Sequence, residues 1–250
     1  MSTVAGAKSK PDIYDPPFVR RLFDEMAHTY GIVNLISSFG FARRWRRQCL
    51  RSIEIAPGSS VLDLMTGMGE LCPDLLKILG VNGSVQAIDI SPVMCARAKQ
   101  HASAKDPLRL CVIQANALNC PIDNESVDYV VSTFGLKTFN LRQLAALANE
   151  VSRVLRPGGQ FAFLEISVPR ARILHLPYMF YLNHIVPMIG RLAMGNPDNY
   201  RLLGVYTSTF RNCKTAVDYF TAADLHVQYQ SYFFGCATGI TGLKPKSEAG

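Results

Sequence analysis

Runs of apolar residues alternate with amphipathic stretches through the middle of this 250-residue chain, and this alternation limits the folds that it can adopt. The apolar runs are short and almost continuous, as expected for strands that are covered on both faces. We predict strands at 60–65, 84–90, 109–115, 126–134 and 160–167. The stretches between them have the spacing of helices, at 69–80, 91–104 and 141–155. Strands and helices that alternate in this way predict a parallel sheet with helices on both faces.

The C-terminal part of the chain changes this rhythm. Residues 226–245 predict two strands around a glycine bend, and therefore an antiparallel hairpin at the edge of the sheet. The expected fold class is thus α/β, with a doubly wound, mostly parallel sheet of seven strands. Residues 168–213 are strongly apolar and long enough to cross a bilayer, but they contain Pro177, Pro187 and recurring polar residues. We predict that they form a helical cap over a ligand site.

The chain is expected to form a single domain over residues 16–250, with N-terminal helices at 16–55. Residues 1–15 are expected to form a flexible tail. Almost half of all residues are apolar and only 18% are charged, which is typical of a chain with a packed core and not of a disordered one.

The cysteine pattern and the net charge limit the cellular compartments and the binding partners that we expect. The seven cysteines include no Cys-x-x-Cys pair, so we expect reduced thiols, a cytoplasmic protein and no metal site. The N-terminal residues contain no apolar segment typical of a secretory signal. The formal charge of +7 is compatible with an anionic partner. The sequence contains no zinc module that would indicate binding to nucleic acid, and we do not expect nucleic acid as a partner. The basic run at 43–47 is compatible with peripheral contact with an anionic membrane. The sequence does not decide between a monomer and a homodimer.

The first predicted strand runs into the turn Thr66-Gly67-Met68-Gly69-Glu70, whose two glycines permit close backbone approach to a ligand. Ligands of such sheets bind beyond the carboxyl ends of the strands. A dinucleotide is disfavoured, because Cys72 stands where the fingerprint needs a third small residue and Glu70 would repel a pyrophosphate. A P-loop is excluded, because no Gly-Lys-Ser/Thr follows. S-adenosylmethionine fits better: it carries a nucleoside without a phosphate, and Asp63 and Glu70 attract its cationic groups.

Polar residues follow the next two strands at positions that suit a nucleoside. Asp89 ends the second strand, where an acid can bind a ribose diol. Asn116 and Ala117 follow the third strand, where a side-chain amide and a backbone group can bind adenine. Each residue alone is equally compatible with a capping or turn role. The ordered set at successive strand ends favours a cofactor site.

Together with other segments, these motifs resemble the ubiquinone/menaquinone biosynthesis C-methyltransferases, the UbiE-like family, over residues 18–245. The segments that carry the resemblance are "FDEMAHTYGIVNLISSFGFARRWRR", "VLDLMTGMGEL", "AIDIS", "QANAL", "STFGLKTF", "VSRVLRPGGQFAFLEIS", "VPMIG", "NYRLL" and "GITGLKP". The resemblance implies a class I, Rossmann-like methyltransferase fold, S-adenosylmethionine as methyl donor, and a ring carbon of a prenylated hydroquinone as acceptor. The complete expected set of cofactor-binding residues is Asp63, Thr66, Gly67, Met68, Gly69, Asp89, Ile90, Asn116, Ala117 and Thr133.

The chain departs from the family pattern where the chemistry is expected. The family's Phe-Gly-Leu-Arg-Asn becomes Phe134-Gly135-Leu136-Lys137-Thr138, and its Tyr-Asp pair becomes Tyr30-Gly31. The family's arginine is thought to help deprotonate the acceptor through water. Lys137 keeps the charge but lacks the planar fork, and we predict that it acts as a cation or a base. Met68 stands where the family usually has threonine, and its thioether is expected to pack on the cofactor.

The N-terminal helices and the cap are expected to form the acceptor pocket. We predict that His184 joins Lys137 in catalysis, with His175 as a second histidine of the cap, and that the pocket is lined by Tyr30, Phe134, Tyr181 and Tyr200. A hydrophobic aromatic small molecule is the expected acceptor. Two alternatives remain: a cyclase or non-catalytic subunit that binds S-adenosylmethionine without transferring its methyl group, and an O- or N-methyltransferase that acts on a small aromatic.

Overall fold

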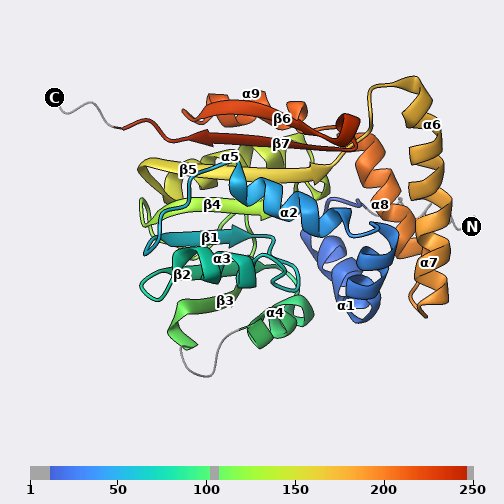
Figure 1. Cartoon of the computed structure of the whole chain (residues 1–250), viewed down its shortest axis with the longest axis horizontal. Coiled ribbons are helices and arrows are strands. Elements are labelled where there is room, and N and C mark those ends of the chain that lie inside the picture. Colours follow the sequence, from blue (N-terminus) through green and yellow to red (C-terminus); the bar gives the residue numbers. More distant parts are fainter. Residues whose placement is uncertain (1–11, 102–106, 247–250) are drawn as a thin grey trace, which may run out of the picture.

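A seven-stranded sheet forms the centre of the molecule (Figure 1). The computed structural model describes residues 12–101 and 107–246. The strands lie in the order β3-β2-β1-β4-β5-β7-β6, with β5–β7 and β7–β6 antiparallel and the other pairs parallel. Their bounds are β1 (Ser60–Leu64), β2 (Ser84–Asp89), β3 (Leu110–Gln114), β4 (Val127–Thr133), β5 (Leu155–Ile166), β6 (His226–Tyr232) and β7 (Ala237–Leu243). The predicted fold class, including the C-terminal hairpin, is confirmed.

Helices cover both faces of this sheet, which explains why the central strands are apolar on both sides. On one face, α2 (Phe41–Arg51) and α3 (Cys72–Leu79) bury Trp45 and Leu75 against β1 and β4. On the other face, α5 (Leu141–Val154) and α9 (Lys214–Ala222) bury Leu147 and Phe220. The short α4 (Pro92–Ala98) begins directly after β2. The carboxyl ends of β1, β2 and β4 therefore meet at one edge, where a ligand can reach them.

The segment Arg156-Pro157-Gly158-Gly159 lies between the predicted helix at 141–155 and the predicted strand at 160–167. It belongs to β5, and the pairing of β5 with β4 shifts register between Val127 and Tyr129. Gly159 is required here because a side chain would lie 2.9 Å from the carbonyl oxygens of Arg156 and Asp128. The strand thus begins one residue after α5, with a bulge in place of a loop.

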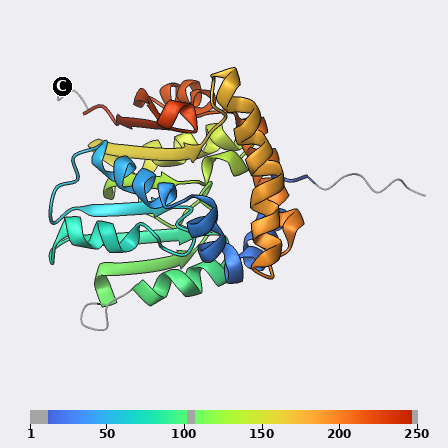
Figure 2. The ribbon, with the colours of Figure 1, turned by 45° about the vertical axis from the view of Figure 1, so that its right-hand side comes forward.

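A second layer of helices stands at the carboxyl edge of the sheet (Figures 1 and 2). The long α1 (Pro16–Ser37) packs Leu22, Met26 and Val33 against this layer. The cap consists of α6 (Arg172–Phe180), the π-helical turn η4 (Tyr181–Ile185), α7 (Val186–Leu192) and α8 (Pro197–Phe210). Over the described ranges, no helix is long and apolar enough to cross a membrane.

The predicted flexible tail is wrong at its C-terminal end. Residues 1–11 lie outside the described residues, but residues 12–15 contact the domain. The Tyr206 hydroxyl donates a hydrogen bond to the carbonyl of Ile13, and the Gln143 amide donates to the carbonyl of Tyr14 over 2.9 Å. The Tyr14 and Tyr206 rings meet edge to face at 5.7 Å. These apolar and aromatic side chains bind the segment to α5 and α8.

Candidate active site

The first cavity lies beyond the carboxyl ends of β1, β2 and β4, beneath α1. It is lined by residues at these strand ends and by Val19, Phe23 and Tyr30 of α1, so a small molecule bound there would contact both the sheet and the helix. Asp89 stands at the end of β2, and its two carboxylate oxygens accept hydrogen bonds from the backbone N–H groups of Gly67 (2.8 Å) and Ser91 (2.9 Å). Burial raises the pKa of Asp89 to about 6. The carboxylate therefore ties the glycine turn to β2 and presents its free lone pairs to the cavity.

The glycine turn is shaped by two left-handed residues, Gly67 (φ 60°) and Gly69 (φ 78°). A side chain at Gly69 would lie 3.0 Å from Ala98 of α4, so only glycine fits there without displacement. Beneath the turn, the Thr66 hydroxyl donates to Asp63 over 2.5 Å. Asp63 is 1% exposed, and burial raises its pKa to about 7. Asp63 therefore supports the turn from below and does not line the cavity.

The far end of the cavity suits a flat heterocycle. The Asn116 side-chain oxygen accepts a hydrogen bond from the backbone N–H of Leu118 over 3.0 Å, which fixes the orientation of the amide. Ile90, Ala117 and Leu118 supply apolar walls beside it. The Asn116 NH₂ group can then donate to a ring nitrogen. This end fits the adenine of S-adenosylmethionine, and Asp89 fits its ribose.

The near end of the cavity carries a charged pair. Arg46 of α2 donates from Nη2 to Glu70 Oε1 over 2.9 Å, and its guanidinium lies over the Phe134 ring at 5.1 Å from the centroid. The Arg46 Nε–H is buried and has no hydrogen-bond partner among the described residues. Both charged side chains line the cavity. Their opposite charges match the carboxylate and the ammonium of an amino-acid group, but Arg46 was missed because the sequence shows only a basic run.

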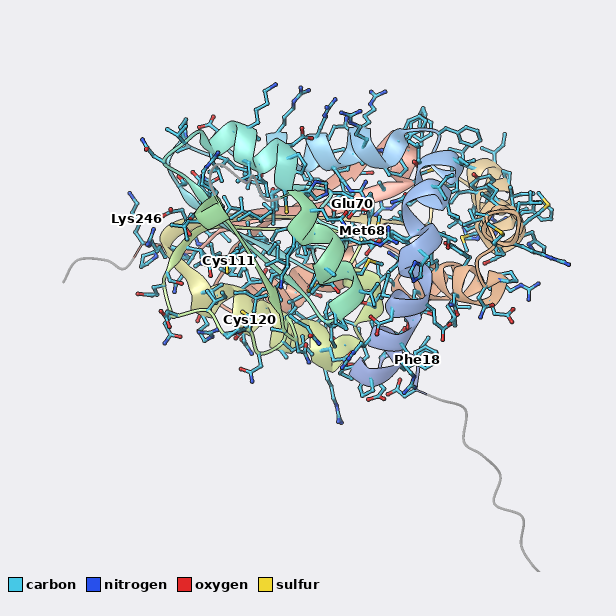
Figure 3. All side chains as sticks on the ribbon, turned by 90° about the horizontal axis from the view of Figure 1, so that it is seen from below. Phe18, Met68, Glu70, Cys111, Cys120 and Lys246 are labelled. Carbon is cyan, nitrogen blue, oxygen red and sulfur yellow. The ribbon has the colours of Figure 1, made fainter. Side chains whose placement is uncertain are left out.

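The structure brings together seven of the ten residues that we predicted at the cofactor, namely Thr66, Gly67, Asp89, Ile90, Asn116, Ala117 and Thr133. Asp63 lies beneath the turn, and Gly69 belongs to the turn but packs against α4 and does not line the cavity. Met68, against the prediction, does not line this cavity. It lines a neighbouring hollow with Glu70, whose other walls come from α1, α2 and α3, and its Cε lies 3.0 Å from where a side chain at Gly31 would begin. Figure 3 shows Met68 and Glu70 next to each other. The left-handed Gly67 reverses the backbone so that the next side chain points to α1.

A second cavity lies between α1, α2 and the cap. Its lining is mainly aromatic and aliphatic, and it includes all four residues predicted for the acceptor pocket: Tyr30, Phe134, Tyr181 and Tyr200. Two hydroxyl groups are fixed, since Tyr200 shares a hydrogen bond with Thr29 (2.8 Å) and Tyr181 donates to the Ser37 carbonyl (2.6 Å). Tyr30 and Phe134 line both cavities and so form the wall between them.

A buried ion pair stands at the wall of this second cavity. Lys137, in the 3-10 turn η3 (Leu136–Thr138), is 4% exposed and donates from Nζ to Glu165 Oε1 (2.8 Å) and to the Phe134 carbonyl (2.7 Å). Glu165, fully buried at the end of β5, also accepts from the backbone N–H groups of Lys137 and Ile166. Two partners occupy two of the three ammonium protons, so the third can face the cavity. The sequence did not single out Glu165.

The predicted catalytic role of His184 is wrong. Its imidazole is exposed, stacks on Phe180 at 4.7 Å between ring centroids, and lines neither cavity. His175 is half-buried and also lies outside both cavities. His184 follows Phe180 by one helical turn and shares its outward face. Among the described residues, no group of histidine, cysteine and carboxylate side chains could hold a metal ion.

The family model of the ubiE/COQ5 methyltransferase family matches residues 8–244. The chain belongs to this family. It is similar to the demethylmenaquinone methyltransferases of Bacillus mycoides and Bacillus anthracis, each 30% identical over 92% of this chain and 97% of the relative. The chain is an S-adenosylmethionine-dependent methyltransferase, as predicted, and the first cavity offers the groups that this cofactor needs.

Solved structures share the fold at low sequence identity. A SAM-dependent methyltransferase from Aquifex aeolicus has a TM-score of 0.58 and 17% identity, and covers 92% of this chain and 98% of its own. The geranyl diphosphate C-methyltransferase of Streptomyces coelicolor, solved with S-adenosyl-L-homocysteine, has a TM-score of 0.57 and 12% identity, and covers 81% and 80%. The [4+2]-cyclase SpnF also has a TM-score of 0.57, with 15% identity and coverage of 82% and 81%. The fold alone therefore does not identify the reaction, because proteins that share it catalyse different reactions.

Proposed function

We propose that this methyltransferase methylates a ring carbon of a hydrophobic phenol or quinol. The observation that carries the proposal is the buried Lys137–Glu165 pair at the wall of an aromatic-lined cavity. Phe134 joins the two parts of the site, because its ring lines both cavities and its carbonyl accepts from Lys137. An acceptor in the second cavity would thus lie against the cofactor cavity and beside a fixed cation.

A phenol ring carbon becomes a good nucleophile when the adjacent hydroxyl loses its proton. S-adenosylmethionine, when bound, supplies an electrophilic methyl group. The Lys137 ammonium stabilises the phenolate by a charge-assisted hydrogen bond, and Glu165 holds that ammonium in place. The hydroxyl proton leaves to solvent, the ring carbon gains the methyl group, and the hydrogen it carried leaves as a second proton. The ring then regains its aromaticity and the oxygen its proton, so that one proton is released overall.

The remaining cavity walls are suited to a lipophilic acceptor. Tyr178, Trp45 and Val33 join the aromatic and aliphatic lining, and the Tyr178 hydroxyl is already occupied by the Cys236 carbonyl over 3.2 Å. Few polar groups therefore remain for a hydrophilic substrate, which disfavours small polar N-methyl acceptors. Because the curated relatives are named demethylmenaquinone methyltransferases, a prenylated naphthoquinol is the first acceptor to assay.

The test measures methyl transfer from labelled S-adenosylmethionine to reduced demethylmenaquinone, with the product analysed by mass spectrometry and NMR. A new carbon–methyl bond on the ring is expected. Lys137→Arg keeps a cation and should retain most of the kcat, whereas Lys137→Met should lower it by roughly 100- to 1000-fold, the usual effect of losing one oxyanion donor.

Removing Lys137 leaves Glu165 buried and unpaired, which destabilises a fold by about 3–5 kcal/mol. The double variant Lys137→Met/Glu165→Gln removes both charges and tests catalysis in a folded protein. A methoxy product would favour O-methylation. Conversion of the acceptor into a product that contains no labelled methyl group would favour a cyclase. A double variant with the kcat of the unmodified protein would contradict the role of Lys137.

A further inference from the structure

The outer face of the cap exposes a row of large apolar side chains. Along α6, η4 and α7, five residues at helical spacing are between 50% and 83% exposed: Ile173, Leu176, Phe180, Met188 and Leu192. We call them the outer stripe. Residues 172–192 form one nearly continuous rod of about 30 Å at the edge of the molecule (Figure 2). Exposed apolar rows of this size mark interaction sites and are rare on surfaces that stay in water.

The charge on this segment has one sign. Between Glu165 and Asp198 the sequence contains no acidic residue, whereas Arg170, Arg172 and Arg191 are all exposed. No ion pair or hydrogen bond joins these three guanidinium groups to any side chain at residues 12–101 or 107–246. Free cations beside an apolar row are complementary to a surface with anionic head groups and an apolar interior.

The mouth of the acceptor cavity opens beside the outer stripe. Phe39 and Phe233 line this cavity and are 79% and 51% exposed, so they form its rim. The Phe39 ring lies 6.3 Å from that of Tyr181, which belongs to the same rod as the outer stripe. Three further apolar side chains of α1 that precede Phe39, Ile32, Leu35 and Ile36, are also exposed. Exposed apolar side chains of α1, of the rim and of the rod therefore lie near the part of the cavity that meets the solvent.

We propose that the outer stripe and the aromatic rim form a docking surface for an anionic lipid bilayer, with the α6–α7 rod lying in the head-group region. The rod does not cross the membrane, because its helices are too short. Its arginines contact lipid phosphates while the outer stripe reaches the acyl boundary. A prenylated acceptor then passes from the lipid phase across the rim into the cavity. This last step rests on the proposed function, whereas the docking itself does not.

The surface can be tested by flotation with vesicles that contain no acceptor, made either of phosphatidylcholine with phosphatidylglycerol or of phosphatidylcholine alone. The variant Ile173→Gln/Leu176→Gln/Phe180→Gln changes only exposed side chains. The matched control Val81→Gln/Leu108→Gln changes two residues that are 80% and 89% exposed next to β2 and β3, at their amino ends. S-adenosylhomocysteine binding by each variant reports that the fold is intact.

We expect the unmodified protein and the control to float with anionic vesicles, less strongly at high salt. The stripe variant should partition on the order of 100-fold less, since three apolar contacts are lost. Absence of binding by the unmodified protein, or equal binding by the stripe variant, would overturn the proposal. A dimer that the stripe substitutions dissociate would assign this face to a second copy of the chain and would also overturn it. Activity on a detergent-dispersed acceptor tests the proposed function separately.

Discussion

The charged pair at the near end of the cofactor cavity leads to a prediction about one part of the cofactor. Arg46 has a buried Nε–H without a partner among the described residues, and its guanidinium is fixed by Glu70 and Phe134. We expect this guanidinium to bind the carboxylate at the methionine end of S-adenosylmethionine. Arg46→Met removes the charge and the donors while it keeps an apolar chain over Phe134. The cofactor should then lose affinity only through its amino-acid part.

The size of the effect follows from the geometry. A hydrogen bond to a charged group contributes about 1.5–3 kcal/mol, and each 1.4 kcal/mol is a factor of about ten in Kd. Loss of one such contact should therefore raise the Kd of S-adenosylhomocysteine by about 10- to 100-fold. In Arg46→Met, Glu70 also loses its partner and repels the ligand carboxylate. The double variant Arg46→Met/Glu70→Gln removes this repulsion together with the attraction of Glu70 for the ligand ammonium, so its affinity should stay in the same range as that of the single variant.

The assay is calorimetric titration with two ligands. S-adenosylhomocysteine carries the amino-acid group, whereas 5′-methylthioadenosine lacks it and keeps the adenine and ribose. Arg46→Met should lower the affinity for S-adenosylhomocysteine and leave the affinity for 5′-methylthioadenosine unchanged. The matched control is Arg47→Met, because Arg47 neighbours Arg46 but pairs with Asp74 at the surface (3.3 Å). If Arg46→Met weakened both ligands equally, or neither, the assignment of Arg46 to the carboxylate would be refuted.

Three further predictions test other parts of the site. Met68→Thr should leave S-adenosylhomocysteine affinity unchanged in calorimetry, because Met68 lines a different hollow; a clear change would show that it reaches the cofactor. Burial raises the pKa of Asp89 to about 6, and ribose hydroxyls favour its charged form. The affinity for S-adenosylhomocysteine should therefore fall as the pH drops below about 6. The variant Asp89→Asn should bind this ligand more weakly, with an affinity that is nearly independent of pH. Trp45, the single tryptophan, lines the acceptor cavity, so a bound quinone should quench its fluorescence; unquenched emission at saturating quinone would contradict this placement.

The sheet and the strand-end residues could be predicted because they depend on local patterns. A strand covered on both faces must be apolar at its centre, as at Val61 and Leu62 of β1, Ala87 and Ile88 of β2, and Val130 and Val131 of β4. Once parallel strands are assigned, their carboxyl ends must meet at one edge. Asp89 and Asn116 therefore had to lie near the glycine turn, wherever the other helices packed.

Arg46 and Glu165 could not be predicted because their positions depend on packing between distant elements. Arg46 reaches the cofactor cavity only because α2 packs on one face of the sheet, with Trp45 buried against it. The sequence of α2 shows five basic residues and does not indicate which of them points inward. Glu165 is read as part of an apolar strand until Lys137 of η3 is found beside it. Neither pairing leaves a pattern in the sequence.

His184 shows a different limit. The cap is apolar around most of its circumference, so helical spacing does not indicate which face is buried. Tyr181 faces the cavity, and His184, three residues later, faces solvent across the π-helical turn. A histidine among apolar residues was therefore assigned to the pocket when it belongs to the outer face. The same ambiguity hides the outer stripe, which reads as buried core in the sequence.

The position of α1 couples the two cavities. Tyr30 of α1 lines both, and Asp24 of the same helix accepts a hydrogen bond from Ser91 over 2.5 Å, next to Asp89, to which we assign the ribose. Any ligand that packs on Tyr30 stabilises α1 in the position that closes the other cavity. Cofactor and acceptor therefore share the free energy of ordering one helix, and each should bind more tightly when the other is present. A helix that covers both cavities would thereby keep water away from the wall across which we propose that the methyl group passes.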